Sequence, residues 1–310
     1  MPHHLVRGIL KNNHGSISKA ITLIENSQSP PEPFFSDIHK NAFNSVRIGI
    51  TGPPGAGKST LTSSLIEFCL ADGKEVGVIA VDPTSPFTGG ALLGDRVRMN
   101  KYSGDNRVFL RSLGNHCDLG GLSSKVQEIG DVLAASGKDY IFFETVGVGQ
   151  GEHDIINVAD ISIVVLVPES GDEIQLMKAG LIEIADIFVI NKSDREGSNR
   201  IASTLKNILH IFKKQDRREP SVFNTIANKQ EGVLELFNGI ELYLRMIDKE
   251  GLLESRKLER YRKRVFDIIQ NSLETSFWSS GKQKQLIDLT KNIDGTSIDP
   301  HTVAKQLLQG

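Results

Sequence analysis

The most regular feature of the sequence is a series of short apolar runs, rich in β-branched residues, that recur from residue 46 onward. The runs with the length of a strand are Val46–Thr51, Val76–Asp82, Val108–Leu113, Tyr140–Thr145, Ile161–Val167 and Ile187–Asn191, with Ser221–Ala227 as a weaker addition. Stretches long enough for a crossover helix lie between most of them, such as Lys58–Asp72, Ser123–Ser136 and Glu173–Ala185. Continuous apolar strands that alternate with helices predict an α/β fold with a mostly parallel central sheet, covered by helices on both faces.

Helical spacing dominates both ends of the chain. Apolar residues near the start form two short helical stripes broken at Asn12–Gly15, and Ser29–Pro33 reads as a linker because consecutive prolines cannot continue a helix. After about Glu231 the strand pattern stops, and the apolar positions of 258–277 again follow helical spacing. We therefore expect an N-terminal helical extension and linker at 1–43, an α/β domain at 44–245 and a C-terminal helical region at 246–310.

Composition narrows the possible classes of protein. The 310 residues carry a net charge of −2 and are 39% hydrophobic, which is enough for a core and too much for a disordered chain. So small a charge gives no electrostatic reason to expect nucleic acid or a membrane surface as partner. Cys69 and Cys117 form no C-x-x-C pair, and no apolar run approaches the ~18 residues of a membrane helix. The two isolated cysteines fit a reducing compartment, and the N-terminus lacks the pattern of a secretory signal, so we expect a cytoplasmic protein. A transit peptide is the alternative, because the chain has no acidic residue before Glu25.

A phosphate-binding motif follows the first predicted strand. It matches G-x-x-x-x-G-K-[ST] at every fixed position and runs through Gly52, Pro53, Pro54, Gly55, Ala56, Gly57, Lys58, Ser59 and the adjoining Thr60. The glycines let backbone N–H groups turn toward phosphate oxygens, Lys58 reaches the β- and γ-phosphates, and the Ser59 hydroxyl ligates Mg²⁺. Because the motif lies between a strand and a helix, it predicts a P-loop NTPase fold.

A second motif identifies the base. Asn191, Lys192 and Asp194 belong to an N-K-x-D sequence at the end of a late strand, the edge at which open α/β sheets bind ligands. The Asp194 carboxylate can accept from N1–H and N2–H₂ of guanine, a donor pair that adenine lacks. Lys192 can cover the base face, Asn191 can brace the loop, and the Ala227 N–H can meet the guanine carbonyl. The motif predicts GTP and GDP rather than ATP as ligands.

Further polar groups end two other strands. Asp82 closes one of them, and Glu144 begins a Glu-Thr-Val-Gly sequence in which Gly147 would give its N–H to the γ-phosphate. We expect Glu144 to hold Mg²⁺ directly or through water, with a helix cap as the alternative role of each acid. Val148 stands where Ras-like proteins place a water-orienting glutamine, so intrinsic hydrolysis should be slow and raised by a partner.

Four segments taken together resemble the MeaB/ArgK/MMAA family of P-loop GTPases: Asp82–Arg96, Glu144–Gln150, Gly171–Lys178 and Asn191–Asp194. Members of that family are GTPase chaperones of adenosylcobalamin-dependent acyl-CoA mutases, typically methylmalonyl-CoA mutase. They gate cofactor loading, protect the mutase from inactivation and usually form homodimers through their C-terminal helices. The resemblance implies the same mutase partner and the same self-association here.

The resemblance also assigns roles by position. Lys58, Ser59, Asp82, Asp95 and Glu144 match nucleotide and magnesium residues, and either Asp82 or Asp95 would position the attacking water. A third switch segment, which couples nucleotide state to the mutase, corresponds to Asp172, Glu173, Gln175 and Lys178. The chain departs from the family pattern at 115–118, at Glu169 and at 225–227. The first two departures touch regions expected to sense the partner.

Two other functions remain alternatives. A nickel-inserting GTPase of a related P-loop family should carry a His-rich tract or a paired Cys/His site, and the scattered histidines and isolated cysteines do not supply one. A transport-associated protein gated by nucleotide would form no GTP-dependent complex with a corrin enzyme. The basic stretch Arg256–Arg264 fits a solvated helix face opposite a dimer contact better than a nucleic-acid surface.

Overall fold

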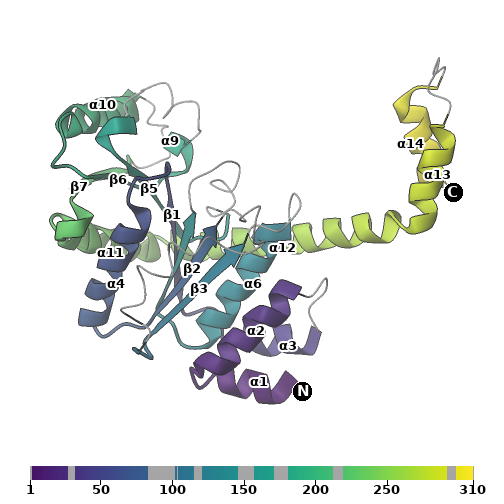
Figure 1. Ribbon diagram of the computed structural model, residues 1–310, viewed down its shortest axis with the longest axis horizontal. Helices are drawn as coiled ribbons and strands as arrows, with labels where there is room; N and C mark the ends of the chain where they lie inside the picture. Colours follow the sequence, from purple (N-terminus) through teal and green to yellow (C-terminus); the bar gives the residue numbers. More distant parts are fainter. Residues whose placement is uncertain are drawn as a thin grey trace. The chain divides into compact units, whose positions relative to one another are not determined.

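The centre of the molecule is a parallel sheet. The computed structural model (Figure 1) describes residues 2–26, 32–82, 102, 104–114, 121–145, 157–170, 181–211, 219–291 and 298–309. The sheet has seven strands in the order β3-β2-β4-β1-β5-β6-β7. These are β1 Val46–Thr51, β2 Val76–Asp82, β3 Val108–Gly114, β4 Tyr140–Thr145, β5 Ile161–Leu166, β6 Ile187–Asn191 and β7 Ser221–Thr225. All their pairings are parallel, which confirms the fold predicted from the apolar runs.

Strand register brings the motifs to one edge. Ile50 lies opposite Glu144 and Thr51 opposite Val164, so the loop after β1 begins beside the ends of β4 and β5. On the other side, Asn191 pairs with Thr225. The carboxyl edge of the sheet therefore collects the candidate nucleotide residues.

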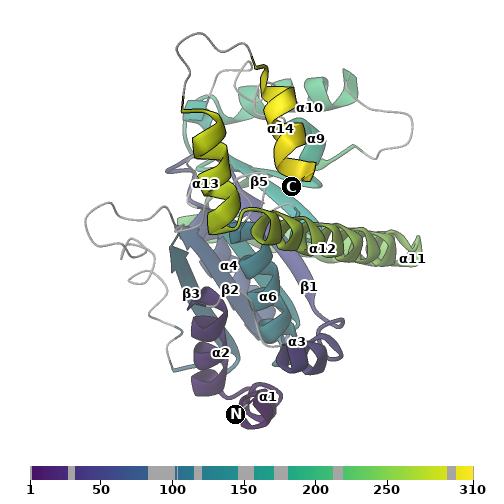
Figure 2. The ribbon, with the colours of Figure 1, turned by 90° about the vertical axis from the view of Figure 1, so that its right-hand side faces the viewer.

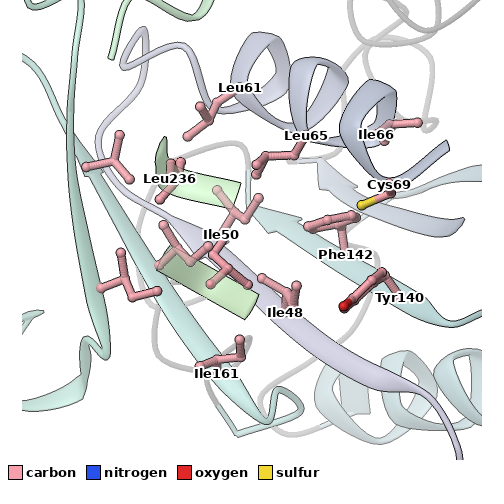
Figure 3. Packing of buried hydrophobic residues seen from close by; sticks show 14 of the residues in the cluster. Ile48, Ile50, Leu61, Leu65, Ile66, Cys69, Tyr140, Phe142, Ile161 and Leu236 are labelled. Atoms are coloured by element: carbon pink, nitrogen blue, oxygen red, sulfur yellow. The ribbon is translucent and has the colours of Figure 1, made fainter. Parts of the chain in front are cut away.

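Helices cover both faces of the sheet. On one face, α4 (Lys58–Ala71) and α11 (Val233–Lys249) pack on alternate side chains of the central strands. Figure 3 shows part of this cluster, in which Leu61 and Leu65 lie over Ile50 and Phe142. On the other face lies α6 (Gly121–Ala135), and α10 (Ser198–Ile211) packs its Leu205 on β5 and β6. The near-continuous apolar strands are thus explained by burial on both sides.

The N-terminal helices belong to the second of these layers. They are α1 (Pro2–Ile9), α2 (His14–Asn26) and α3 (Glu32–His39), and they lie against α6 in both views (Figure 1 and Figure 2). Glu25 of α2 accepts a hydrogen bond from Arg111 of β3, and its carbonyl accepts one from Lys125 at 2.8 Å. The helix α3 was not predicted. Its Pro33 lies in the first turn, where a missing N–H breaks no helical hydrogen bond.

The C-terminal part consists of helices. The chain divides into two compact units, residues 1–257 and residues 258–310. The helix α12 (Leu252–Phe277) begins in the first unit and continues into the second, which also holds α13 (Ser280–Leu289) and α14 (Pro300–Gln309). Val303 and Leu307 of α14 are buried, whereas many apolar side chains of α12 are exposed. No helix in the described ranges is long and apolar enough to cross a membrane.

Aspartates accept hydrogen bonds from backbone N–H groups at the amino edge of the sheet. The residue before each of β4, β5 and β6 is an aspartate whose Oδ2 accepts from a backbone N–H of a neighbouring segment at 2.8–2.9 Å. The pairs are Asp139 with Glu75, Asp160 with Arg47 and Asp186 with Ser162. These carboxylates satisfy donors that the strand ladder leaves without a partner.

Candidate nucleotide site

The phosphate-binding loop is held by close backbone contacts that only glycine permits. Gly52 has φ +139°, and a Cβ there would lie 2.1 Å from the Val165 carbonyl oxygen. Gly57 has φ +85°, and a Cβ there would lie 2.4 Å from Asn191 Nδ2. Both torsions lie in the region that side chains disfavour. The loop is therefore fixed between β5 and the N-K-x-D segment.

Lys58 begins α4 and lies over the loop it closes. Its ammonium donates to the Gly52 carbonyl at 2.8 Å and the Pro53 carbonyl at 3.0 Å, and the residue is only 5% exposed. Hydrogen bonds compensate much of the cost of burying such a charge. The contacts place a cation where the motif requires one for phosphate oxygens.

Oxygen ligands for a divalent cation gather beside Lys58. The Ser59 hydroxyl donates to Glu144 Oε1 at 2.5 Å, and the Thr62 hydroxyl lies 3.2 Å from Glu144 Oε2. Glu144 is 1% exposed, so its carboxylate is held in a dry site at the end of β4. A hydroxyl and a carboxylate are the hard oxygen donors that suit Mg²⁺. The donor set at Ser59 and Glu144 therefore fits the metal that the sequence predicts.

Asn191 connects the phosphate-binding loop to the end of β7 and the turn that follows it. Its Nδ2 donates to the Ala56 carbonyl at 2.8 Å. Its Oδ1 accepts from the Thr225 hydroxyl and from the Ala227 N–H, both at 3.1 Å. These contacts join the loops that Asn191 is predicted to brace. The Ala227 N–H, predicted to meet the guanine carbonyl, donates to Asn191 Oδ1 here. Lys192 follows with φ +56°.

Two exposed ion pairs lie in this region, and one of them contains Asp194, the carboxylate predicted to read guanine. Asp194 Oδ2 lies 3.5 Å from Lys229 Nζ, and Asp194 itself is exposed. Arg195 donates to Glu169 of the short helix η2 (Pro168–Ser170) and lowers the pKa of the Glu169 carboxyl. Sequence reasoning noted Glu169 as a departure but found neither its partner nor Lys229. These ion pairs had no sequence signal because their members lie far apart in the chain.

Among the remaining predicted residues, Asp82 is the one whose backbone the structure describes. Asp82 ends β2, and its neighbour Val81 pairs with Thr145 of β4, so the Asp82 backbone reaches the same edge. Asp95, Gly147, Asp172, Glu173, Gln175 and Lys178 lie outside the described residues, as do 115–118 and Val148. The roles predicted for them stay predictions.

Comparison with known proteins assigns the family. A family model described as methylmalonyl-CoA mutase-associated GTPase MeaB matches residues 17–282. The chain belongs to the MeaB family. A Pyrococcus abyssi protein named as a GTPase is 39% identical to it, and the alignment covers 100% of this chain and 96% of that protein. GTPase ArgK of Escherichia coli is 32% identical, with 97% and 94% covered.

Other similar proteins carry more specific names. A mouse protein named methylmalonic aciduria type A homolog, mitochondrial, is 28% identical over 98% of this chain and 78% of its own length. The crystal structure of an LAO/AO transport system kinase superposes with a TM-score of 0.71 at 26% identity and covers 99% of this chain and 96% of that one. HypB from Helicobacter pylori, solved with nickel, is 18% identical with a TM-score of 0.50, a likeness of fold alone. The family and the P-loop GTPase fold predicted from the motifs are confirmed.

Proposed function

We propose that this MeaB-family GTPase is a Mg²⁺-dependent chaperone of an adenosylcobalamin-dependent acyl-CoA mutase, with methylmalonyl-CoA mutase as the first candidate. It would gate cofactor loading and protect the mutase from inactivation. The observation that carries the proposal is a family match across 17–282, whose description names that mutase, on a chain with a formed P-loop and N-K-x-D site. The name of the mouse relative points to the same metabolic step.

The nucleotide chemistry follows from the described groups. Lys58 would move its hydrogen bonds from the loop carbonyls to the β- and γ-phosphates, and Asp194 would read the guanine edge. Ser59 and Glu144 would hold Mg²⁺, which when bound neutralises charge on the phosphates. Asp82 or Asp95 would position the attacking water and Gly147 would contact the γ-phosphate. Without a glutamine at Val148, we expect slow hydrolysis until a partner assists.

Self-association through the C-terminal helices is a further part of the proposal. In the second unit, three apolar side chains of α12 are more than half exposed: Phe266, Ile269 and Leu273. Apolar area of this kind on one helix is typical of a protein interface. A homodimer would cover it.

We expect Ile269→Glu to convert the protein to a monomer at micromolar concentration, because a buried charge without a partner opposes association. Sedimentation velocity measures the change. Gln270→Glu adds the same charge at the adjacent exposed polar position and should leave the assembly intact. A wild-type protein that sediments as a monomer would refute the dimer.

The test of the partner is a capture experiment. The protein, loaded with GDP or with a non-hydrolysable GTP analogue, is used to retain proteins from a lysate of its source, and the recovered species are identified by mass spectrometry. We expect a cobalamin-dependent acyl-CoA mutase whose yield depends on the nucleotide. Gln175→Ala and Lys178→Ala should reduce that dependence without reducing GTP affinity, because both belong to the predicted switch segment. Recovery of hydrogenase or urease maturation factors, or of transporter subunits, would favour the alternative functions.

A further inference from the structure

The Glu144 carboxylate is held by two hydroxyls of the same helix. Ser59 donates to Oε1, and Thr62, one turn further along α4, lies 3.2 Å from Oε2. Residues three apart on a helix share a face, so both hydroxyls point to the end of β4. Thr62 is 0% exposed. Each carboxylate oxygen of Glu144 thus has its own hydroxyl contact.

We propose that Thr62 is a positioning residue of the magnesium site: its hydroxyl fixes the second oxygen of Glu144 and so sets the orientation in which the carboxylate meets the metal or its water. The inference rests on the proposed Mg²⁺-dependent GTPase function. It adds a residue that the P-loop motif, which ends at Ser59, does not contain. Thr62 would act through Glu144 and would touch neither metal nor nucleotide.

A purely structural role for this hydroxyl is the alternative. The Thr62 hydroxyl has one proton, which it shares between Glu144 Oε2 at 3.2 Å and the Lys58 carbonyl at 3.0 Å. The second contact is a bond within the helix that Ser and Thr often make. Ser64 makes the same kind of bond, 3.1 Å to the Thr60 carbonyl, with its other contact to the Ala227 carbonyl instead of Glu144. Ser64 is therefore the matched control: a buried hydroxyl of α4 with the helical bond and without the carboxylate.

The expected effect is on the metal more than on the nucleotide. Groups that orient metal ligands typically change metal affinity by about 10–100-fold when they are removed. In Thr62→Val the side chain keeps its shape and loses its donor. We therefore expect the Mg²⁺ concentration for half-maximal retention of a fluorescent GDP to rise about tenfold. Its affinity for GDP in EDTA should stay at the wild-type value, because loop N–H groups and Lys58 bind phosphate without the metal.

The experiment titrates Mg²⁺ against nucleotide release from the full-length protein. Thr62→Ser keeps the hydroxyl and should have the wild-type Mg²⁺ midpoint. Ser64→Ala should have the same midpoint. Thr62→Ala gives a second reading if the valine variant unfolds, and thermal unfolding identifies that case. Equal Mg²⁺ midpoints for wild type and both hydroxyl-free variants would overturn the inference. A wild-type protein whose guanine-nucleotide binding ignores Mg²⁺ would instead overturn the proposed function.

Discussion

One amide holds three segments of the nucleotide site. Asn191 contacts the Ala56 carbonyl of the P-loop, the Thr225 hydroxyl at the end of β7 and the Ala227 N–H of the next turn, at 2.8–3.1 Å. It is 3% exposed, so these bonds are shielded from water. One hydrogen-bonded arrangement therefore joins the P-loop to the segments predicted to contact the base. Changes at Asn191 should affect both the phosphate contacts and the base contacts predicted here.

A substitution at Asp194 tests recognition of the base separately from binding of the phosphates. We expect Asp194→Asn to lower the preference for GTP over xanthosine triphosphate by at least about 10²-fold, because a hydrogen-bonding site strongly rejects a ligand with the wrong donors. Competition binding with a fluorescent guanine nucleotide measures both affinities. Glu196→Gln removes a carboxylate from the same exposed loop and should change neither. Equal losses for both nucleotides would remove Asp194 from the base site.

His14 gives a pH-dependent contribution to stability. Burial and, second, the nearby Lys138 ammonium lower its pKa below the usual 6.5, against the opposing effects of the Asn106 carbonyl, 3.1 Å from Nε2, and of Glu75. As the pH falls below about 6.5, the unfolded chain binds a proton at His14 more readily than the folded protein does. The free energy of unfolding therefore falls as the pH drops.

We therefore expect His14→Gln to be more destabilising at about pH 7.5 than at about pH 5.5, since only the wild type loses stability on protonation of this group. Urea unfolding at both pH values measures the difference. A pH-independent effect of His14→Gln would contradict the assignment.

Among the elements, the parallel sheet depends on the aspartates at its amino edge. Asp160 accepts the Arg47 N–H at 2.9 Å, and Arg47 is 3% exposed. Asp160→Ala should lower the free energy of unfolding by about 1–3 kcal/mol, because it leaves a buried donor unpaired. Asp160→Asn keeps an acceptor oxygen and should recover part of the loss. Chemical denaturation measures the free energy of unfolding of each variant. An equal decrease for Asp160→Ala and Asp160→Asn would show that this hydrogen bond does not contribute to stability.

Strand positions were predictable because burial on both faces leaves a long apolar run. The predicted Val46–Thr51, Val76–Asp82 and Tyr140–Thr145 match β1, β2 and β4 residue for residue. The helix α3 escaped prediction because Pro33 looks like linker sequence yet is tolerated in a first turn. Local sequence cannot show which of these conformations the rest of the fold stabilises.

The candidate site was predictable where function fixes local spacing. The P-loop and N-K-x-D segments carry their chemistry in consecutive residues, so Lys58, Ser59 and Asn191 can be nominated as candidates from the sequence alone. Thr62 and Arg195 could not be nominated in this way, because their contacts are with Glu144 and Glu169, which belong to other parts of the chain. Contacts of this kind appear only once the sheet order is known.

At the scale of the whole molecule, a partly buried cluster of polar side chains holds the first turns of α12 at the amino edge of the sheet. Arg256 donates to both oxygens of Asp186 at 2.8–3.0 Å and to the Asp160 carbonyl at 2.7 Å. Tyr243 also donates to Asp186, and burial, together with that carboxylate, raises the pKa of Tyr243 to about 12. Arg256 is the second residue before the boundary of the helical unit. The cluster therefore lies close to the end of the first unit, which contains the sheet.

We expect Arg256→Met to destabilise the protein by about 3 kcal/mol, because Asp186 is left as a buried charge without its cation. Pairing it with Asp186→Asn should cost less than the sum of the single changes, and urea unfolding of the four proteins gives the coupling energy. Arg262→Met, at an exposed position of the same helix, is the control. Strict additivity would show that the two side chains do not interact.

The N-terminal helices matter for any attempt to isolate the GTPase part. Ile17, Ile21 and Ile24 of α2 share one hydrophobic cluster with α6 and with Phe143 of β4. A fragment that began at residue 44 would expose that cluster to water, and an apolar surface of this size promotes aggregation. The candidate nucleotide residues all follow residue 44, so a clipped molecule would keep its ligand groups and lose solubility. Proteolysis near the start of the chain should therefore shorten the lifetime of the protein without altering its chemistry.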